Sequence, residues 1–379
     1  MVVYVSDLSK SQTRNLLCGQ PVPVLIYQFL FIMQPALPTK MRALFLLKRV
    51  TAYNQEDLES CFEVREVDVP TPKYGEVLVK VECSPINPSN LSMLQGTYNS
   101  AKQAPLPSLT GTEGSGVVVA AGGGFMAWYM VGKRVGIVKS DQGLWAEYVT
   151  VPAMTCITLP NEVSFESGSS CFVNPLTVVA FVELAIARGT KTIVHTAGAS
   201  ALGKMLIKHG KEYGIDVIAV VRRQEQAQVL QSIGAKYIVD TSNSEWKTQL
   251  KTLTQTLGST LAFDAVAGSL TGDILTCMPK GSEVQVYGGL SNEPSSGVSP
   301  ADLIFQDKSV TGFWLVKYLA KRGMLGKLFM IQKVTSGLNS TFQTTISKTY
   351  GLENAIQAFR DYTGNMSDNK VAFKPTQIV

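Results

Sequence analysis

The sequence predicts a two-domain α/β protein in which a β-rich domain precedes a doubly wound parallel sheet. The chain has 379 residues, which is more than one hydrophobic core usually serves, so two domains are expected. Short strands separated by turn signals fill the first half, whereas strands alternate with helices in the second half. Hydrophobic residues make up 45% and charged residues 17% of the chain, which is typical of globular proteins.

The first domain is predicted from strands with two-residue alternation. Residues 76–81 alternate polar and apolar side chains, and residues 114–119 form a second strand that a run of three glycines ends. Loops between the two strands are indicated by the prolines Pro85, Pro88, Pro105 and Pro107. We therefore expect a β-rich domain over residues 41–171.

The second domain is predicted from short apolar strands that alternate with helices. The strands are expected at residues 191–196, 215–221, 237–240, 261–266 and 283–290. Strand–helix repeats of this length predict a doubly wound parallel sheet over residues 172–311. A helix at 352–362 and a strand at 371–373 are too few for a third domain. We therefore expect residues 312–379 to return to the first domain.

Residues 1–40 form an N-terminal extension. Lys10, Arg14 and several Ser and Thr accompany a single acid, Asp7, which resembles an organelle transit peptide. The apolar run 24–33 is too short to span a bilayer, so no membrane span is expected. The alternative is that the natural start lies near Met41, where a strand begins.

Charge and cysteine usage limit the class of protein. The net charge is +5 and no long Lys/Arg run occurs, so a nucleic-acid partner is not expected. No two of the six cysteines form a C-x-x-C pair, and a chain of this size does not need disulfides. A reducing compartment is therefore favoured, with a mitochondrial location as the first expectation and a cytoplasmic one as the alternative.

A dinucleotide-binding loop follows the first strand of the second domain. Strand 192–196 runs directly into Gly198, Ala199, Ser200 and Ala201 and then a helix. Small residues let the backbone approach a pyrophosphate, and the helix N-terminus supplies free N–H groups. The pattern is G-x-S-x-x-G, in which the Ser200 hydroxyl can donate where the usual Rossmann fingerprint has glycine. The alternative is a tight turn without a ligand.

The end of the next strand predicts which dinucleotide binds. NAD enzymes normally place an acid there for the ribose 2′-hydroxyl, but this chain has Arg222 and Arg223. A guanidinium can hold a 2′-phosphate with two parallel hydrogen bonds. We therefore expect NADPH as the cofactor. A solvated basic turn is the alternative.

The sequence does not predict a metal site. An active-site zinc needs a combination of Cys, His and other ligands, yet the chain has only two histidines. His195 lies on the strand before the dinucleotide loop, and His209 lies on the helix after it. The cysteines also lack the clustered spacing of a structural zinc lobe. We expect the electrophile to be activated without zinc.

Five segments in order resemble mitochondrial-type 2-enoyl thioester reductases, which are zinc-independent medium-chain dehydrogenase/reductases. They are residues 85–90, 95–98, 174–177, 287–289 and 312–315. The resemblance spans about residues 41–375, and it implies a GroES-like catalytic domain followed by a Rossmann domain. Quinone oxidoreductases share this scaffold. Two positions depart from the pattern, because Asn90 replaces an Asp and Thr112 replaces the histidine of zinc-dependent members.

The resemblance implies that Tyr98 is the catalytic residue. Hydride addition to the β-carbon of an unsaturated thioester leaves negative charge on the carbonyl oxygen, which a protonated phenol can stabilise or help to protonate. Without the motif, Tyr98 would be an ordinary loop tyrosine. The resemblance also implies cofactor contacts by Asn174, Thr177, Gly198, Ala199, Ser200, Ala201, Leu202, Arg222, Arg223, Tyr287, Gly288, Gly289, Leu290, Phe313, Trp314, Leu315 and Lys370.

The expected partner is an acyl thioester of coenzyme A or of acyl carrier protein. Lys317, Lys321, Arg322 and Lys327 follow the Trp motif and could attract its phosphates or an acidic carrier, or form a solvated helix face. A homodimer is expected from the family. Two alternatives remain open: an NADPH-dependent quinone or enone reductase, and a catalytically silent subunit of a mitochondrial assembly.

Overall fold

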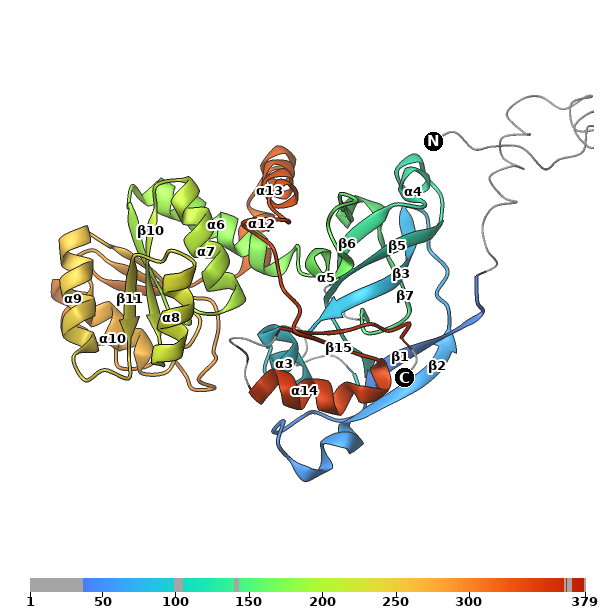
Figure 1. Cartoon of the computed structure of the whole chain (residues 1–379), viewed down its shortest axis with the longest axis horizontal. Helices are drawn as coiled ribbons and strands as arrows, with labels where there is room; N and C mark the ends of the chain where they lie inside the picture. The colour runs from blue at the N-terminus through green and yellow to red at the C-terminus, as the bar shows by residue number, and fades with distance from the viewer. Residues whose placement is uncertain (1–36, 99–104, 140–142, 365, 367–369, 378–379) are drawn as a thin grey trace, which may run out of the picture. The chain divides into compact units, whose positions relative to one another are not determined.

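The structure is a computed structural model that describes residues 37–98, 105–139, 143–364, 366 and 370–377. The chain divides into two units, Met1–Thr39 and Lys40–Val379, and the fold described below belongs to the second (Figure 1). The expected extension 1–40 lies almost wholly outside the described residues. None of the described helices is long and apolar enough to cross a bilayer.

The first domain, which lies within the second unit, is built from antiparallel strands, as the two-residue alternation predicted. Strand β1 (Lys40–Leu46) pairs with β2 (Phe62–Asp68) and β4 (Ser108–Leu109). A seven-stranded sheet has the order β15-β16-β3-β5-β6-β8, with β7 paired to β3. Its strands from this part are β3 (Glu76–Pro85), β5 (Glu113–Ala121), β6 (Arg134–Val138), β7 (Tyr148–Pro152) and β8 (Ile157–Thr158). The short helices are α3 (Pro88–Gln95), α4 (Phe125–Met130) and α5 (Phe165–Gly168).

A six-stranded sheet forms the centre of the second domain, and all of its strand pairs are parallel. Its order is β11-β10-β9-β12-β13-β14, which is the doubly wound Rossmann order. The strands are β9 (Thr192–His195), β10 (Asp216–Val221), β11 (Tyr237–Asp240), β12 (Leu261–Asp264), β13 (Glu283–Val286) and β14 (Ser309–Gly312). The expected parallel sheet is therefore confirmed.

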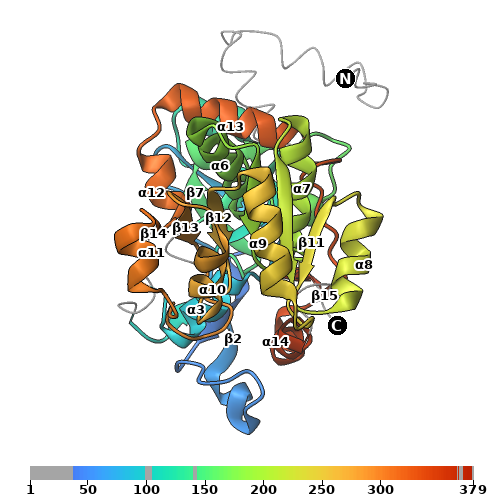
Figure 2. The ribbon, with the colours of Figure 1, turned by 90° about the vertical axis from the view of Figure 1, so that its left-hand side faces the viewer.

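Helices cover both faces of this sheet because each buries one apolar stripe. One core contains side chains of α6 (Val173–Arg188), α7 (Ala201–Glu212) and α8 (Gln224–Ser232). The opposite core contains side chains of α9 (Trp246–Leu257) and α10 (Leu270–Cys277). Figure 2 shows α8 and α9 on opposite sides of β11. Helix α11 (Pro300–Phe305) precedes β14.

The C-terminal segment, residues 312–379, divides between the first and the second domain. Helices α12 (Leu315–Ala320) and α13 (Met324–Ser336) pack on α6 and add side chains to its core. Further on, β16 (Val371–Phe373) pairs with β3 and with β15 (Lys348–Tyr350). Helix α14 (Ala355–Gly364) shares a core with α3 and lies beside it in Figure 1. The expected return of residues 312–379 to the first domain therefore holds only from β15 onward, about the second half of the segment.

The strand expected at 283–290 is wrong over its last four residues. Strand β13 ends at Val286. The Tyr287 N–H still donates to the Asp264 carbonyl oxygen at 2.8 Å as the last bond of the ladder, but the Gly288 N–H turns back to the same oxygen at 3.4 Å. The Leu290 N–H similarly donates to the Ala265 carbonyl oxygen at 3.0 Å. Residues 287–290 therefore fold back over the end of β12.

Candidate functional site

The dinucleotide loop is held close to the sheet by glycines. The Gly198 N–H donates to the Val220 carbonyl oxygen at 2.9 Å, and a Cβ on Gly198 would lie 2.7 Å from the Ala219 Cβ. A Cβ on Gly203 would lie 2.2 Å from the Gly198 carbonyl oxygen. Any larger residue at either position would force the loop away from β10 or α7. The backbone of this loop is therefore fixed where a ligand would approach.

Ser200 caps α7. Its hydroxyl oxygen accepts a hydrogen bond from the Gly203 N–H at 3.1 Å, which satisfies one of the free donors of the first turn. The hydroxyl proton is still available for donation, as the sequence analysis proposed. Ala199 and Leu202 are buried in the core, so any contact with a phosphate would be made by their backbone groups.

Arg222 and Arg223 follow β10 and are exposed. Arg223 is the N-cap of α8, and the Arg222 N–H donates to the Gln226 side chain at 3.0 Å. These backbone contacts fix the turn without using the guanidinium groups. Neither guanidinium forms an ion pair with a residue in the described ranges.

The chain after β12 is organised by Asp264, a buried residue that the sequence analysis missed. Its Oδ1 accepts from the Thr196 hydroxyl at 2.7 Å and from the Val266 N–H at 2.8 Å. Its Oδ2 accepts from the Thr271 hydroxyl at 2.7 Å. These bonds join the ends of β9 and β12, at the point where the strand order reverses. Only its place at a strand end could have indicated this role in the sequence.

An aromatic cluster lies beside these strand ends. Phe181 of α6 stacks on Phe263 with ring centroids 3.7 Å apart, and it meets Tyr287 and Phe313 edge-on. Phe313 and Leu315 are partly buried against this core. The predicted residues 313 and 315 therefore have a packing role, whatever else they contact.

His195 and Tyr287 form a hydrogen-bonded pair in this cluster. The His195 Nε2 lies 2.8 Å from the Tyr287 hydroxyl, and the rings are stacked. Burial lowers the pKa of His195 to about 3 and raises that of Tyr287. Both groups are therefore neutral at physiological pH, and His195 is fully buried in the core.

The predicted catalytic residue, Tyr98, contacts Trp314, which was predicted to contact the cofactor. Trp314 is 46% exposed, and its Nε1–H donates to the Tyr98 phenol oxygen at 3.0 Å. Tyr98 follows α3, where Gly96 adopts φ 74° and the Tyr98 N–H donates to the Ser92 carbonyl oxygen. Since the phenol oxygen accepts from Trp314, its own proton is free for another acceptor.

A buried carboxylate lies where three predicted site segments meet. Glu113 opens β5 and is fully buried. Its Oε1 accepts from the Asn87 side-chain amide at 2.6 Å, and its Oε2 accepts from the Val173 N–H at 3.1 Å. The Lys370 ammonium donates to the Asn87 side-chain oxygen. Glu113 was not predicted from the sequence, although an acidic residue at the start of an apolar strand is a visible signal.

The two departures from the family pattern are in direct contact. The Asn90 side-chain amide donates to the Thr112 hydroxyl at 2.9 Å, and its oxygen accepts from the Asn87 N–H at 2.9 Å. All three residues are buried. Asn90 therefore supports the start of α3 and has a partner for each side of its amide.

The remaining predicted residues are spread over α6 and the segment that follows β14. Asn174 is partly buried in the first turn of α6, and Thr177 is buried one turn later. Lys317 and Lys321 are exposed. Arg322 instead binds the Glu183 carboxylate at 2.5 Å and contacts Tyr318, so its charge is already paired.

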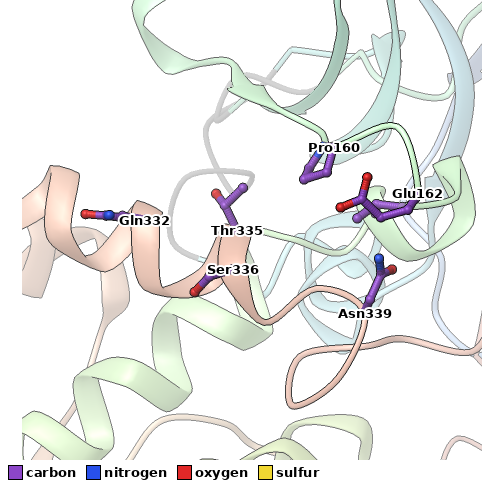
Figure 3. A pocket seen from close by; sticks show the side chains of 7 residues that line it. Pro160, Glu162, Gln332, Thr335, Ser336 and Asn339 are labelled. Atoms are coloured by element: carbon purple, nitrogen blue, oxygen red, sulfur yellow. The ribbon is translucent and has the colours of Figure 1, made fainter.

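Neither a metal cluster nor the hollow in Figure 3 coincides with these residues. Across the described residues, no group of three or more His, Cys, Asp or Glu side chains could hold a metal ion. A hollow of about 280 Å³ lies between α13 and the loop after β8 (Figure 3). None of the predicted cofactor or catalytic residues lines it.

Comparisons with known proteins agree with this geometry. Residues 73–161 match the alcohol dehydrogenase GroES-like domain, and residues 201–328 match the zinc-binding dehydrogenase family. The mitochondrial enoyl-[acyl-carrier-protein] reductase of Xenopus tropicalis is 28% identical over 277 residues, which are 72% of this chain and 78% of that protein.

Solved structures give the same result. A crystal structure assigned as an NADPH:quinone reductase from Mesorhizobium loti is 31% identical, with a TM-score of 0.81 over 90% of this chain and 100% of that one. A mitochondrial 2-enoyl thioester reductase heterodimer from Candida tropicalis shares the fold, at 21% identity and a TM-score of 0.72 over 89% and 100% of the chains. The chain therefore belongs to the medium-chain dehydrogenase/reductase family of oxidoreductases.

Proposed function

We propose that this protein uses NADPH to reduce the C=C bond of a 2-enoyl thioester. The observation that carries the proposal is the hydrogen bond from Trp314 to the Tyr98 phenol. It brings together two motifs that resemble the enoyl reductases and that are 216 residues apart in the chain. The enoyl-[acyl-carrier-protein] reductases among its relatives support the same activity.

The loop after β9 fits a dinucleotide. Helix geometry leaves the N–H groups of Ala201 and Leu202 without intrahelical acceptors, and the positive end of α7 favours a phosphate. The exposed guanidinium groups of Arg222 and Arg223 would hold a 2′-phosphate. The predicted contacts of Asn174, Thr177 and residues 287–290 would lie toward the nicotinamide. NADPH, when bound, would supply the hydride.

Tyr98 would act on the substrate carbonyl. As hydride reaches the β-carbon, the electron pair of the C=C bond moves toward the thioester oxygen, and the phenol proton can stabilise that charge. Accepting a hydrogen bond from Trp314 polarises the phenol and makes it a stronger donor. A proton must then reach the α-carbon, which Tyr98 would donate or relay.

The thioester would be carried by coenzyme A or by acyl carrier protein. Lys317 and Lys321 are one helical turn apart at the end of α12 and are exposed, so they could attract phosphates or an acidic carrier. Arg322 is a weaker candidate, because Glu183 already neutralises it. We also propose a homodimer through the edge strand β14 and the exposed Leu303, Ile304 and Phe305 of α11. A mitochondrial location follows the names of the relatives.

A side-by-side assay tests the function. Purified protein should oxidise NADPH with a medium-chain 2-enoyl-CoA, and faster than it oxidises NADH. Removing one transition-state donor costs on the order of a hundredfold in kcat, so Tyr98→Phe should slow turnover by about that factor. Tyr74→Phe is the matched control, since Tyr74 is 83% exposed and lies beside Gly124. Unchanged turnover in Tyr98→Phe would remove the phenol from the mechanism.

A quinone or enone reductase is the second candidate, supported by the Mesorhizobium loti structure. That reaction needs a bound nicotinamide and a flat acceptor pocket. Faster NADPH oxidation with quinones than with the enoyl thioester would favour it. A catalytically silent subunit of a larger mitochondrial assembly is the third reading, which any turnover of NADPH would dismiss.

A further inference from the structure

The fully buried Glu113 carboxylate has no part in the mechanism described so far. Both oxygens are used, one by the Asn87 amide at 2.6 Å and one by the Val173 N–H at 3.1 Å. Its third neighbour is a cation, because the Lys370 ammonium donates to the opposite end of the same Asn87 amide. The amide is thereby oriented, with its oxygen toward the lysine and its nitrogen toward the carboxylate.

These contacts join three segments that each carry a predicted site residue. Asn87 is the N-cap of α3, the helix that leads to Tyr98. Val173 is the first residue of α6 and immediately precedes Asn174. Lys370 itself is a predicted cofactor residue that precedes β16. The positive end of the α6 dipole also favours a carboxylate at this position. Glu113 therefore lies between two positive groups, the N-terminus of α6 and the Lys370 ammonium.

We propose that Glu113 is a positioning residue that holds Lys370 and the first turn of α6 in register with the segment ending in Tyr98. This inference rests on the proposed function. Glu113 does not contact the reacting atoms; it sets where the groups that do so lie.

The charges around Glu113 and Lys370 predict a measurable dependence on pH. Burial lowers the pKa of Lys370 to about 8, and Glu113 opposes that shift. Burial likewise raises the pKa of Glu113, whereas Lys370 and the hydrogen bonds from Asn87 and Val173 favour its charged form. The other titratable groups that face the pair are Cys83, Cys171 and Tyr362, and burial raises the pKa of each, so they stay neutral. Removing the charge of Glu113 should therefore lower the pKa of Lys370 further.

Glu113→Gln tests the inference with little change in shape. Its amide nitrogen would face a donor in either orientation, because Asn87 and Val173 both donate to Glu113. We expect the Kd and KM for NADPH to rise about tenfold, which corresponds to one hydrogen bond to a charged group. The alkaline limb of kcat/KM for NADPH should move to lower pH by roughly one unit. The KM for the enoyl thioester should change less.

Matched variants separate positioning from general damage. Glu166→Gln removes a nearby partly exposed carboxylate that pairs with Lys374 at 2.6 Å, and it should leave both the NADPH affinity and the alkaline limb unchanged. Lys370→Met should weaken NADPH binding similarly, and combining it with Glu113→Gln should add little. If Glu113→Gln does not accumulate as folded protein, Glu113→Asp can be used instead. It keeps the negative charge but moves it away from Asn87 and Val173, because the aspartate side chain is shorter. It should raise the KM for NADPH and shift the limb by a smaller amount.

The outcomes distinguish this inference from the proposed function. A wild-type protein that neither binds nor oxidises NADPH overturns both. An active wild type whose folded Glu113 variants keep the wild-type KM for NADPH and the wild-type alkaline limb overturns the positioning role alone. A raised KM with an unmoved limb also overturns it, because that result means damage to the fold without loss of charge at Lys370.

Discussion

At the scale of single residues, the turn after β10 is the clearest chemical signal in the chain. Arg222 and Arg223 are exposed, and their backbone is fixed by α8 while their guanidinium groups stay out of ion pairs within the described ranges. A positioned but unneutralised cation pair at the end of a Rossmann strand is what a 2′-phosphate requires.

Replacing both arginines should change cofactor choice more than turnover. Charge-assisted hydrogen bonds contribute about 1.5–3 kcal/mol each, so Arg222→Ala/Arg223→Ala should raise the KM for NADPH by about a hundredfold. The KM for NADH should change little, because NADH lacks the 2′-phosphate. Steady-state kinetics with both cofactors measures this, and Arg360→Ala on the exposed side of α14 is the control. An equal rise for both cofactors would contradict the assignment.

At the scale of elements, the sequence predicted the helices and strands that can be recognised from their own residues alone. The bounds of β11 agree with the expected strand 237–240, because a short apolar run is enough to indicate a strand of a parallel sheet. The end of β13 was missed because the turn there depends on Asp264, which belongs to another strand. Helix α11 was missed as well, because the buried Asp302–Lys308 pair that holds it in place depends on contacts with α10, 26 to 33 residues earlier in the chain.

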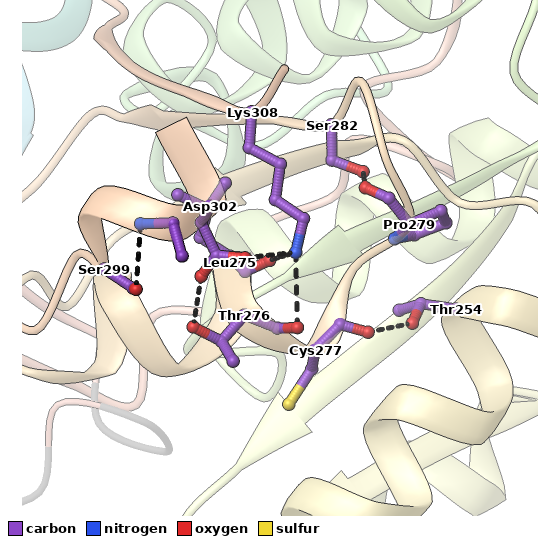
Figure 4. Close-up of polar contacts among 10 residues, drawn as sticks. Thr254, Leu275, Thr276, Cys277, Pro279, Ser282, Ser299, Asp302 and Lys308 are labelled. Carbon is purple, nitrogen blue, oxygen red and sulfur yellow. Dashed lines mark hydrogen bonds and ion pairs between the residues drawn. The ribbon is translucent and has the colours of Figure 1, made fainter. Parts of the chain in front are cut away.

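That ion pair fixes α11 to the end of α10. The Lys308 ammonium donates to the Asp302 carboxylate at 2.8 Å and to the carbonyl oxygens of Leu275 and Thr276 (Figure 4). The Thr276 hydroxyl completes the group by donating to Asp302 at 2.7 Å. Lys308 is only 7% exposed. It thus satisfies last-turn carbonyls of α10, where a cation is favoured.

Lys308→Met should destabilise the protein by roughly 3–5 kcal/mol, since it leaves the Asp302 charge buried without its partner. Chemical denaturation monitored by circular dichroism measures this. Lys348→Met, which removes a largely exposed lysine from its pair with Asp361, should cost about 1 kcal/mol or less. Lys308→Met combined with Asp302→Leu should recover most of the stability. No recovery would show that the loss came from packing.

At the scale of the whole molecule, the fold was predictable while the centre of the candidate site was not. The parallel sheet and the cofactor loop follow from local patterns. The contacts of Glu113 join residues that are far apart in the chain, because Asn87 is 26 positions away and Val173 is 60 positions away. Lys370 contacts Asn87 across 283 positions. No local pattern contains that information. The resemblance supplied Tyr98 and Trp314, but their direct contact is a property of the folded chain.

Global stability should carry the signature of a histidine that folding keeps neutral. The ordinary pKa of histidine is about 6.5, whereas burial lowers that of His195 to about 3. Between these two values the unfolded chain binds a proton at this position and the folded chain does not, so acidification favours unfolding. The contribution of His195 is fully present above about pH 7 and falls as pH decreases through 6.5.

His195→Gln should therefore flatten the dependence of unfolding free energy on pH. At about 1.4 kcal/mol per pKa unit, the wild type should lose about 2 kcal/mol more than the variant between pH 7 and pH 5. Glutamine can still bond the Tyr287 hydroxyl, which His195 Nε2 meets at 2.8 Å. Comparing the two slopes, measured by denaturant titration at each pH, removes any constant cost of repacking. Parallel slopes would contradict the prediction, because they would mean that the imidazole titrates in the folded protein as it does in the unfolded chain.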